Sequence, residues 1–326
     1  MNICTWIHEG EGSRESDWRC AAVFFATSRR HNPLADHILF TDASSVPRIR
    51  GFDLERFLIE ELKVRIERVP LSYRSPFGFQ GMRKSPFYLF DVIKRIASPG
   101  EDEEAKYAVF HPDCVWLRPA SIVESQLERY GLLTMATEDA VLTEAELNSI
   151  SRLKLREIYR EMLGETPVRV PEVCGSECFA ATVKEARKLM PELERVWSVS
   201  LERFRRNRPR LADEEQMLGF AYARLGYPPR TANPFIKRIR TSPDAAGNED
   251  PDDLYLTVWH LPDETDVGFV RVYRDVVRGR TVFRTAKADA YRRYLSRAMG
   301  VRLGRRGLTA RGMRNLVYRK LRHIVK

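Results

Sequence analysis

An apolar run at residues 107–116 reads YAVFHPDCVW and is interrupted by one polar turn. Residues 107–110 predict a buried strand, and the apolar residues after the turn predict a second apolar segment. If the first strand belongs to a parallel sheet, Asp113 lies at its carboxyl edge, where open α/β sheets bind their ligands. A hard cation held there by carboxylate oxygen would be shared with a diphosphate. One carboxylate is too few for a tight site, so we expect further ligands from other segments.

On both sides of this run, short apolar stretches alternate with amphipathic stretches of helical period, as in sheets whose parallel strands are joined by crossover helices. Upstream, we predict strands at residues 2–7, 37–41 and 64–69 and helices at 17–30, 52–62 and from Ser85-Pro86 onward. Downstream, we predict strands at 132–136, 178–182, 254–260 and 268–273 and helices at 144–162, 182–206 and 213–225. The predicted fold class is therefore α/β.

Composition limits the kind of protein. The 326 residues are 43% hydrophobic, which is enough for one large domain or two small ones. The net charge of +10 favours anionic partners. The five cysteines are odd in number and scattered, which favours a reducing compartment over a disulfide framework. Neither a signal peptide nor about 18 consecutive apolar residues can be found, so we expect a cytoplasmic location.

The run at residues 107–116 resembles the strand and Asp-x-Asp motif of GT-A glycosyltransferases, where an apolar strand precedes Asp, any residue, Asp and more apolar residues. Asp113 stands in the place of the second, metal-binding aspartate, and His111 replaces the first. Histidine also ligates manganese or hydrogen-bonds a ribose hydroxyl. The resemblance covers roughly residues 1–262 and implies a GT-A-like, Rossmann-related mixed sheet flanked by helices.

Four further segments resemble the same superfamily, in the same order along the chain. Residues 81–87 resemble the place where basic side chains meet the donor phosphates, here Arg83 and Lys84. Residues 174–179 resemble the Gly-Gly-x-Phe segment beside the acceptor, and residues 213–216 resemble the acidic helix that follows it. Trp259-His260-Leu261 resembles the late histidine that supplies another metal ligand.

The resemblance implies a glycosyltransferase, hexosyltransferase-like, that moves a sugar from a nucleotide-diphosphate donor to a glycan or a surface polysaccharide precursor. The expected cofactor is Mn²⁺ or Mg²⁺, with Asp113 and His260 as ligands. The expected donor-binding residues are Thr5, His8, Arg83, Lys84, His111 and Asp113. We expect Asp213 or Glu214 to be the acceptor base, with Glu177 as the substitute. A retaining enzyme needs no strong base, and both stereochemical outcomes stay open.

Each of these residues also has an interpretation in which its role is only structural. In that interpretation Asp113 caps a turn, and His260 is a hydrogen-bonded core histidine. His111 is a polar residue at the edge of the site. Arg83 and Lys84 become surface charges, and the acidic residues 213–215 only favour a helix N-terminus.

The basic tail is a separate feature. From about Arg271, acidic residues almost vanish while arginine and lysine alternate with apolar residues. We expect a boundary near residue 265, between a transferase domain at 1–265 and a basic, amphipathic helical extension at 266–326. The extension is expected to bind an anionic surface, either a membrane leaflet with shallow insertion of apolar side chains or a partner in polysaccharide assembly. The alternative is a solvated helical cover for the core.

Two other functions are weaker alternatives. A sugar nucleotidyltransferase normally carries a glycine-rich loop with an arginine after its first strand, whereas residues 8–14, HEGEGSR, are too acidic and too poor in glycine. Nucleic-acid binding is supported only by the basic tail and leaves the α/β body without a role, so nucleic acid is not the expected partner.

Overall fold

The computed structural model describes residues 1–10, 15–80, 87–137, 146–147, 150–163, 172, 174–242 and 248–301. A six-stranded sheet with the strand order β5-β2-β1-β6-β11-β8 forms the centre of the molecule. Its strands are β1 (Asn2–Ile7), β2 (Asp36–Thr41), β5 (Val64–Arg68), β6 (Lys106–Phe110), β8 (Leu132–Leu133) and β11 (Cys178–Thr182). The first four strands in that order run parallel, and β11 is antiparallel to both of its neighbours. The α/β class with a mixed sheet is thus confirmed.

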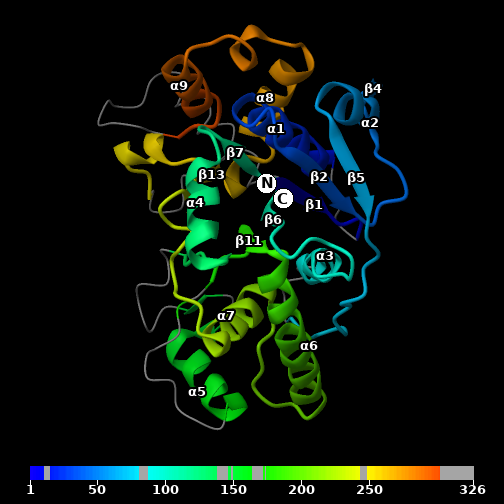
Figure 1. Cartoon of the computed structure of the whole chain (residues 1–326), viewed down its shortest axis with the longest axis vertical. Coiled ribbons are helices and arrows are strands. Elements are labelled where there is room, and N and C mark those ends of the chain that lie inside the picture. The colour runs from blue at the N-terminus through cyan, green and yellow to red at the C-terminus, as the bar shows by residue number, and fades with distance from the viewer. Residues whose placement is uncertain are drawn as a thin grey trace.

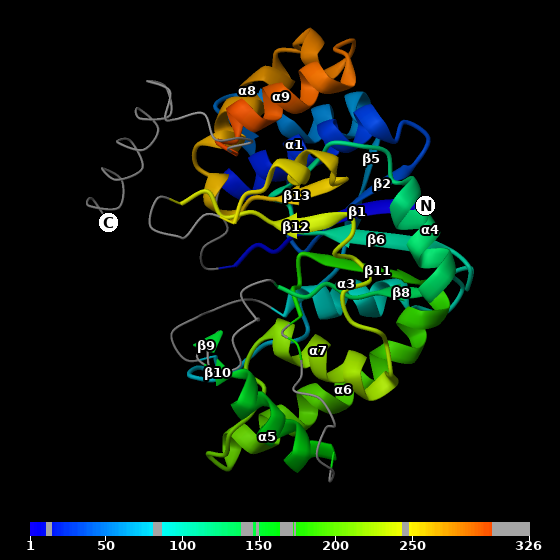
Figure 2. The ribbon, with the colours of Figure 1, turned by 90° about the vertical axis from the view of Figure 1, so that its left-hand side faces the viewer.

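Helices cover both faces of the sheet because its strands are apolar on both sides. In β1, Ile3 and Ile7 belong to one core cluster, and Cys4 and Trp6 belong to the other. Figures 1 and 2 show helices above and below the sheet. One face carries α1 (Glu15–His31), α8 (Gly268–Val277) and α9 (Ala288–Ala298); the other carries α3 (Tyr88–Ile96), α5 (Arg152–Leu163), α6 (Val183–Arg205) and α7 (Glu214–Leu225). Helix α4 (Ser121–Tyr130) adds Val123 and Leu127 to the first cluster.

A second sheet has the order β12-β13-β7, and it places the late strands β12 and β13 beside β7, which follows β6 in the chain. Its strands are β7 (Cys114–Trp116), β12 (Ile236–Arg238) and β13 (Val258–His260). Strand β13 is antiparallel to β7 and parallel to β12. Two short ladders, β3 (Arg48–Ile49) with β4 (Phe52–Asp53) and β9 (Glu146–Leu147) with β10 (Ile150–Ser151), lie outside both sheets.

The predicted strands at 2–7, 37–41, 64–69 and 178–182 and the helices at 17–30, 182–206 and 213–225 are confirmed to within a few residues. Five other segments differ from their predictions. Residues 52–62 form β4, the short α2 (Leu54–Arg56) and a π-helical turn η1 (Phe57–Glu61) instead of one helix. The predicted helix at 144–162 begins only at Arg152, after the β9–β10 ladder. The predicted strand at 132–136 pairs as β8 over its first two residues only.

The fourth difference concerns residues 254–260, where β13 starts only at Val258. Residues 251–255 form the 3-10 turn η3 (Pro251–Tyr255), because the Asp250 side chain caps it in a reciprocal capping box. The predicted helix start at Ser85-Pro86 lies outside the described residues, and α3 is described from Tyr88.

The predicted strand at 268–273 is wrong, because these residues begin helix α8. Phe269, Val272, Tyr273 and Val276 are buried at helical spacing and share a core cluster with α1. The apolar residues of the described tail are thus used for packing. The turns η4 (Pro262–Glu264) and η5 (Thr281–Phe283) flank α8.

Helix α9 is packed in the same way. Tyr291 and Leu295 are fully buried, and the Tyr291 hydroxyl donates to the Trp116 carbonyl at 3.1 Å. The expectation that these two side chains insert into a membrane is therefore wrong. The apolar residues beyond 301 lie outside the described residues. The boundary near residue 265 stays a prediction. Among the described helices, none has the length and apolarity that crossing a membrane requires.

Candidate metal centre

Three strand ends converge where β6 stops. Strand β11 pairs with β6 so that Cys178 lies opposite Phe110, and the His111 amide donates to the Glu177 carbonyl at 3.0 Å. Strand β13 pairs with β7 so that His260 lies opposite Cys114, and the Leu261 amide donates to the Asp113 carbonyl at 3.0 Å. Backbone pairing alone therefore brings the residues after β6 next to the end of β13.

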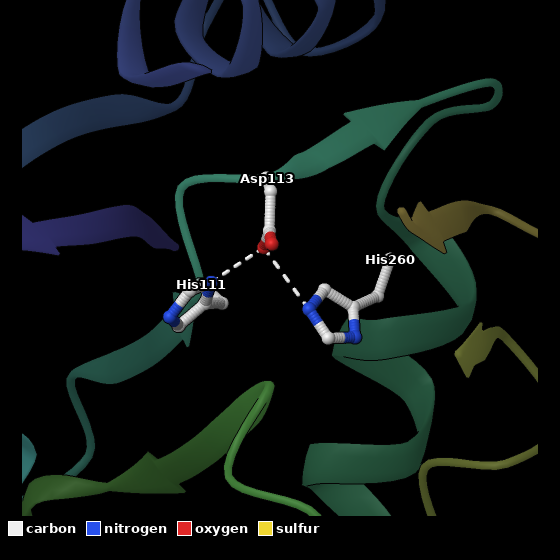
Figure 3. Close-up of side chains that lie close together, drawn as sticks. All are labelled: His111, Asp113 and His260. Carbon is white, nitrogen blue, oxygen red and sulfur yellow. Dashed lines mark hydrogen bonds and ion pairs between the residues drawn. The ribbon is translucent and has the colours of Figure 1, made fainter. Parts of the chain in front are cut away.

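His111, Asp113 and His260 form a cluster at this place (Figure 3), and their potential ligand atoms lie within 4.8 Å of one another. His260 Nε2 lies 3.0 Å from Asp113 Oδ1. His111 Nδ1 contacts the same oxygen. The Asp113 and His260 side chains are 6% and 7% exposed, whereas that of His111 is 36% exposed. The cluster is thus accessible from the His111 side.

Asp113 and His260 stabilise each other's charged forms. Burial alone raises the pKa of Asp113, but the charges and hydrogen bonds of His111 and His260 outweigh it and hold that pKa well below its usual range. Burial lowers the pKa of His260, but Asp113 and Glu177 overcome this and raise it to about 9. The cluster therefore retains its negative carboxylate, and a bound cation would have to replace a proton of His260.

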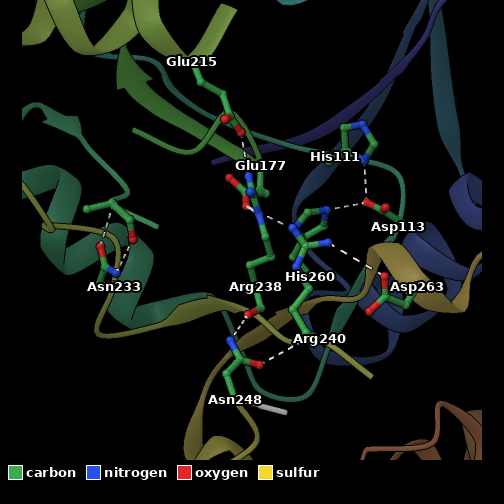
Figure 4. Close-up of polar contacts among 11 residues, drawn as sticks. His111, Asp113, Glu177, Glu215, Asn233, Arg238, Arg240, Asn248, His260 and Asp263 are labelled. Atoms are coloured by element: carbon green, nitrogen blue, oxygen red, sulfur yellow. Dashed lines mark hydrogen bonds and ion pairs between the residues drawn. The ribbon is translucent and has the colours of Figure 1, made fainter. Parts of the chain in front are cut away.

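A buried ion network extends from His260 away from Asp113 (Figure 4). His260 Nδ1 lies 3.2 Å from Glu177 Oε1. Arg238 donates from Nε to the same Glu177 oxygen and from Nη2 to Glu215 Oε1, at 2.6 Å in the second case. Burial opposes ionisation of Glu177, yet Arg238 and His260 lower its pKa strongly. Glu177 is therefore better suited to remain a charged partner of Arg238 and His260 than to accept a proton during a reaction.

No protein-family model and no curated protein matches the sequence. Among solved structures, the chain is similar to an active-site mutant of LgtC, with a TM-score of 0.50, 11% identity and coverage of 90% of this chain and 100% of that one. It is also similar to galactosyltransferase LgtC in complex with donor and acceptor sugar analogs, with 12% identity, a TM-score of 0.49 and coverage of 89% and 98%. For mouse xyloside xylosyltransferase 1 the identity is 10%, the TM-score 0.49 and the coverage 82% and 100%.

The chain has a GT-A fold. At 10–12% sequence identity, the similarity to these structures shows the fold alone. The roles of the site residues are therefore argued from the geometry of this chain. Within the GT-A fold, Asp113 and His260, which we expected as metal ligands, lie side by side, and His111 joins them.

The donor set fits a divalent metal. Two imidazole nitrogens and one carboxylate oxygen are ligand types used by manganese and similar ions. All three are close enough to share one ion. In Figure 3, both histidine rings point toward the Asp113 carboxylate from different elements. The contacts of His260 with Asp113 and Glu177 also fit a hydrogen-bonded core histidine, so the role of His260 as a metal ligand stays a prediction.

The predicted donor-binding residues have different surroundings. His8 follows β1, its Nδ1 lies 2.7 Å from Asp42 Oδ2, and its ring stacks on Tyr88 with centroids 5.5 Å apart. Thr5 is fully buried, and its hydroxyl donates to the Phe110 carbonyl at 2.8 Å; its contact with the donor stays a prediction. Arg83 and Lys84 lie outside the described residues.

The two expected acceptor bases lie at the start of α7. Asp213 is the N-cap, and its side chain accepts from the Gln216 amide at 2.8 Å. Glu214 is buried, and burial, with Glu215 next, raises its pKa well above the usual range. Ser176 and the Leu89 backbone hydrogen-bond to Glu214 and oppose this shift. Asp213 therefore has a structural task, whereas Glu214 holds its proton more tightly than an exposed carboxyl.

Arg238, Glu215 and Asp42 were not predicted from the sequence as site residues. Asp42 directly follows a predicted strand of the parallel sheet, which is the same signal that pointed to Asp113. Arg238 ends a three-residue strand that is too short for a periodic signal. Glu215 belongs to an acidic run in which no spacing distinguishes one carboxylate from the next.

Proposed function

We propose that this chain is a metal-dependent glycosyltransferase that moves a sugar from a nucleotide-diphosphate donor to a glycan acceptor, such as a surface polysaccharide precursor. The observation that carries the proposal is the convergence of His111, Asp113 and His260 at the carboxyl end of β6 in a GT-A fold. In parallel-stranded α/β sheets this edge is where ligands bind. A nucleotide-diphosphate is an anion that needs a cation at such an acidic position.

We propose that His111, Asp113 and His260 hold the metal, with Mn²⁺ favoured over Mg²⁺ because magnesium prefers a shell of oxygen ligands. When bound, the cation offsets the charge that develops on the leaving diphosphate. The protein contributes the position of the three ligands. Asp113 and His260 are buried and held by strand pairing, so little reorganisation is needed when the ion binds.

Donor binding is assigned to the carboxyl edge of β1 and β6. His8, fixed by Asp42 and stacked on Tyr88, lies at the end of β1, the strand next to β6. Trp6 links the two positions, because its ring packs against both Tyr88 and His111, with centroids 5.9 Å and 5.3 Å away. We also propose that Arg83 and Lys84 face the donor phosphates.

We propose that Glu214 or Asp213 accepts the proton of the attacking hydroxyl. Burial raises the pKa of the Glu214 carboxyl, which increases its proton affinity. A general base works best when its pKa lies near the working pH. Glu177 suits this task less, because Arg238 and His260 lower its pKa.

The basic tail is proposed to hold the enzyme at an anionic surface on the cytoplasmic side, either a membrane leaflet or a partner in assembly. In the described part, Arg274, Arg278, Arg293 and Arg297 are exposed on α8 and α9. Basic side chains near an acidic leaflet contribute about 1 kcal/mol each. All five cysteines are free, which agrees with a reducing compartment.

The proposed activity is tested by incubating the protein with a panel of nucleotide-diphosphate sugars and Mn²⁺ or Mg²⁺. A thermal-shift screen first selects the donors, because a ligand that binds only the folded state raises the melting temperature. Mass spectrometry then follows release of the nucleoside diphosphate and transfer of the sugar to glycan acceptors. Metal-dependent release from one donor supports the proposal. No stabilisation by any donor, with or without metal, contradicts it.

A further inference from the structure

Glu177 lies behind His260, on the side away from Asp113 (Figure 4). The His260 ring has one nitrogen facing each carboxylate: Nε2 is 3.0 Å from Asp113 Oδ1, and Nδ1 is 3.2 Å from Glu177 Oε1. The Glu177 side chain is 2% exposed. It is thus a buried carboxylate whose nearest cationic neighbours are His260 and Arg238.

We propose that Glu177 is a positioning residue that orients His260 for metal binding, and that Arg238 fixes Glu177 and connects it to helix α7 through Glu215. This inference rests on the proposed metal site. It assigns Glu177 a different task from that of an acceptor base.

The chemistry of imidazole gives Glu177 this role. His260 binds a metal only as the neutral ring, so the ion must displace one of the two protons of the charged ring. The neutral ring has one protonated nitrogen and one nitrogen with a free lone pair, and the hydrogen bond at one nitrogen determines which is which. Glu177 has no proton to donate when ionised, so it favours the proton on Nδ1. The lone pair then lies on Nε2, the nitrogen that faces Asp113 and the cluster. Metal-bound histidines usually donate their other nitrogen to a carboxylate or carbonyl in this way.

Arg238 holds the carboxylate in place. Strands β12 and β13 pair in parallel with Arg238 beside His260, so both side chains arise at the same level of the sheet. The Arg238 guanidinium bridges Glu177 and Glu215, and its side chain is 15% exposed. Its backbone is fixed as well, because the Asn248 side chain donates to the Arg238 carbonyl at 2.7 Å. Glu215 lies in the first turn of α7, next to Glu214.

The Glu177 carboxylate lies close against the backbone of Gly175. A Cβ atom on Gly175 would lie 1.9 Å from Glu177 Oε2, which is far inside a van der Waals contact. Any other residue at 175 would therefore displace the Glu177 carboxylate. Glycine at this position thus serves the placement of Glu177.

The test measures Mn²⁺ affinity of the full chain by electron paramagnetic resonance of free Mn²⁺, alone and with saturating UDP, GDP, ADP or CDP. Glu177→Gln keeps the shape but removes the charge, and it is expected to weaken Mn²⁺ binding by about tenfold to a hundredfold. Asp275→Asn is the matched control, because Asp275 is also buried and paired with an arginine, Arg280, at 3.0 Å. This control is expected to leave Mn²⁺ affinity unchanged.

A double variant separates positioning from charge balance. Glu177→Gln alone leaves Arg238 with one carboxylate partner, and this imbalance by itself would perturb the site. Glu177→Gln with Arg238→Gln removes both charges, so a purely structural role predicts that the double variant regains normal Mn²⁺ affinity. Our inference predicts that affinity stays weak, while the metal-free melting temperature recovers toward that of the unmodified protein.

The outcomes separate this inference from the proposed function. If the unmodified protein binds Mn²⁺ and Glu177→Gln binds it equally well, the positioning role is overturned and the metal site stands. Recovery of affinity in the double variant also overturns it. If the unmodified protein binds no Mn²⁺, alone or with any of the four diphosphates, both the metal site and the positioning role fall.

Discussion

His260 Nε2 lies 3.0 Å from Asp113 Oδ1 because β13 pairs antiparallel with β7 and sets His260 opposite Cys114, the neighbour of Asp113. The candidate centre therefore depends on a small second sheet as well as on the end of β6. Any change that loosens β13 from β7 separates the two ligands, even when the main sheet is intact.

The acceptor base is tested by Asp213→Asn and Glu214→Gln. The change at the true base is expected to reduce turnover by about a hundredfold to ten-thousandfold while donor binding is retained. Asparagine is a good N-cap, so Asp213→Asn keeps the start of α7. Asp250→Asn, at the cap of η3, is the matched control and should retain full activity. Near-normal turnover in both test variants removes this role and favours a retaining mechanism.

Helix α8 is predicted to be part of the folded core. Phe269 is fully buried against the cluster that includes α1, so Phe269→Ala should lower the free energy of unfolding by about 3–5 kcal/mol. Phe77 is 94% exposed, and Phe77→Ala should change it by less than about 0.5 kcal/mol. Urea denaturation followed by circular dichroism measures both. Equal, small effects would mean that α8 is an appendage, in agreement with a domain boundary at residue 265.

Stability should fall in acid partly because of His37. Burial, followed by the charge of Arg29, lowers the pKa of His37 from 6.5 to about 3. A hydrogen bond to the Ala35 carbonyl raises this pKa but does not outweigh the other two effects. Between these pH values the unfolded chain binds a proton that the folded chain does not, so the free energy of unfolding rises with pH there, by about 1.4 kcal/mol per unit. In His37→Gln this contribution is absent.

The measurement is urea denaturation of both proteins between pH 4 and pH 7. The stability advantage of the unmodified protein over His37→Gln should shrink as the pH falls. An advantage that is constant with pH would show that His37 does not titrate in this way. Ser28, which hydrogen-bonds His37 Nε2 at 2.8 Å, offers a milder variant, Ser28→Ala, with the same expected trend.

The tail is tested by vesicle flotation of the full chain and of a chain ending at Val301. The full chain is expected to float with vesicles that contain anionic phospholipid, because its basic residues are attracted to the surface, and to ignore neutral vesicles. The shortened chain should lose most of this binding. Equally weak binding of both chains to anionic vesicles contradicts the membrane hypothesis and leaves a protein partner to be sought.

The sequence predicts those elements whose signals are local. The apolar runs of β1, β2 and β11 and the capped helices α6 and α7 are examples, and the predicted α/β class is confirmed. Residues 268–273 misled us because GFVRVY is a short, mostly apolar run rich in valine, and a run of this length fits a strand as well as a helix.

Only some of the residues of the site can be predicted from the sequence. The resemblance pointed to Asp113 and His260, and it left His111 open between a ligand and an edge residue. The network of Arg238, Glu177 and Glu215 comes from three segments that are distant in sequence, and no local pattern predicts which carboxylate an arginine will meet. The pairing of β12 with β13 and of β11 with β6 brings Arg238 and Glu177 together.

Isothermal titration of UDP, GDP, ADP and CDP into the protein tests the metal centre most directly, with Mn²⁺, with Mg²⁺ and with a chelator. Asp113→Asn is compared with the unmodified protein and with the control Asp275→Asn. We predict that at least one diphosphate binds only with metal, more tightly with Mn²⁺ than with Mg²⁺, and that Asp113→Asn loses this binding while remaining folded. Nucleotide affinity that is indifferent to both metals and to chelator, and unchanged in Asp113→Asn, would contradict the metal centre.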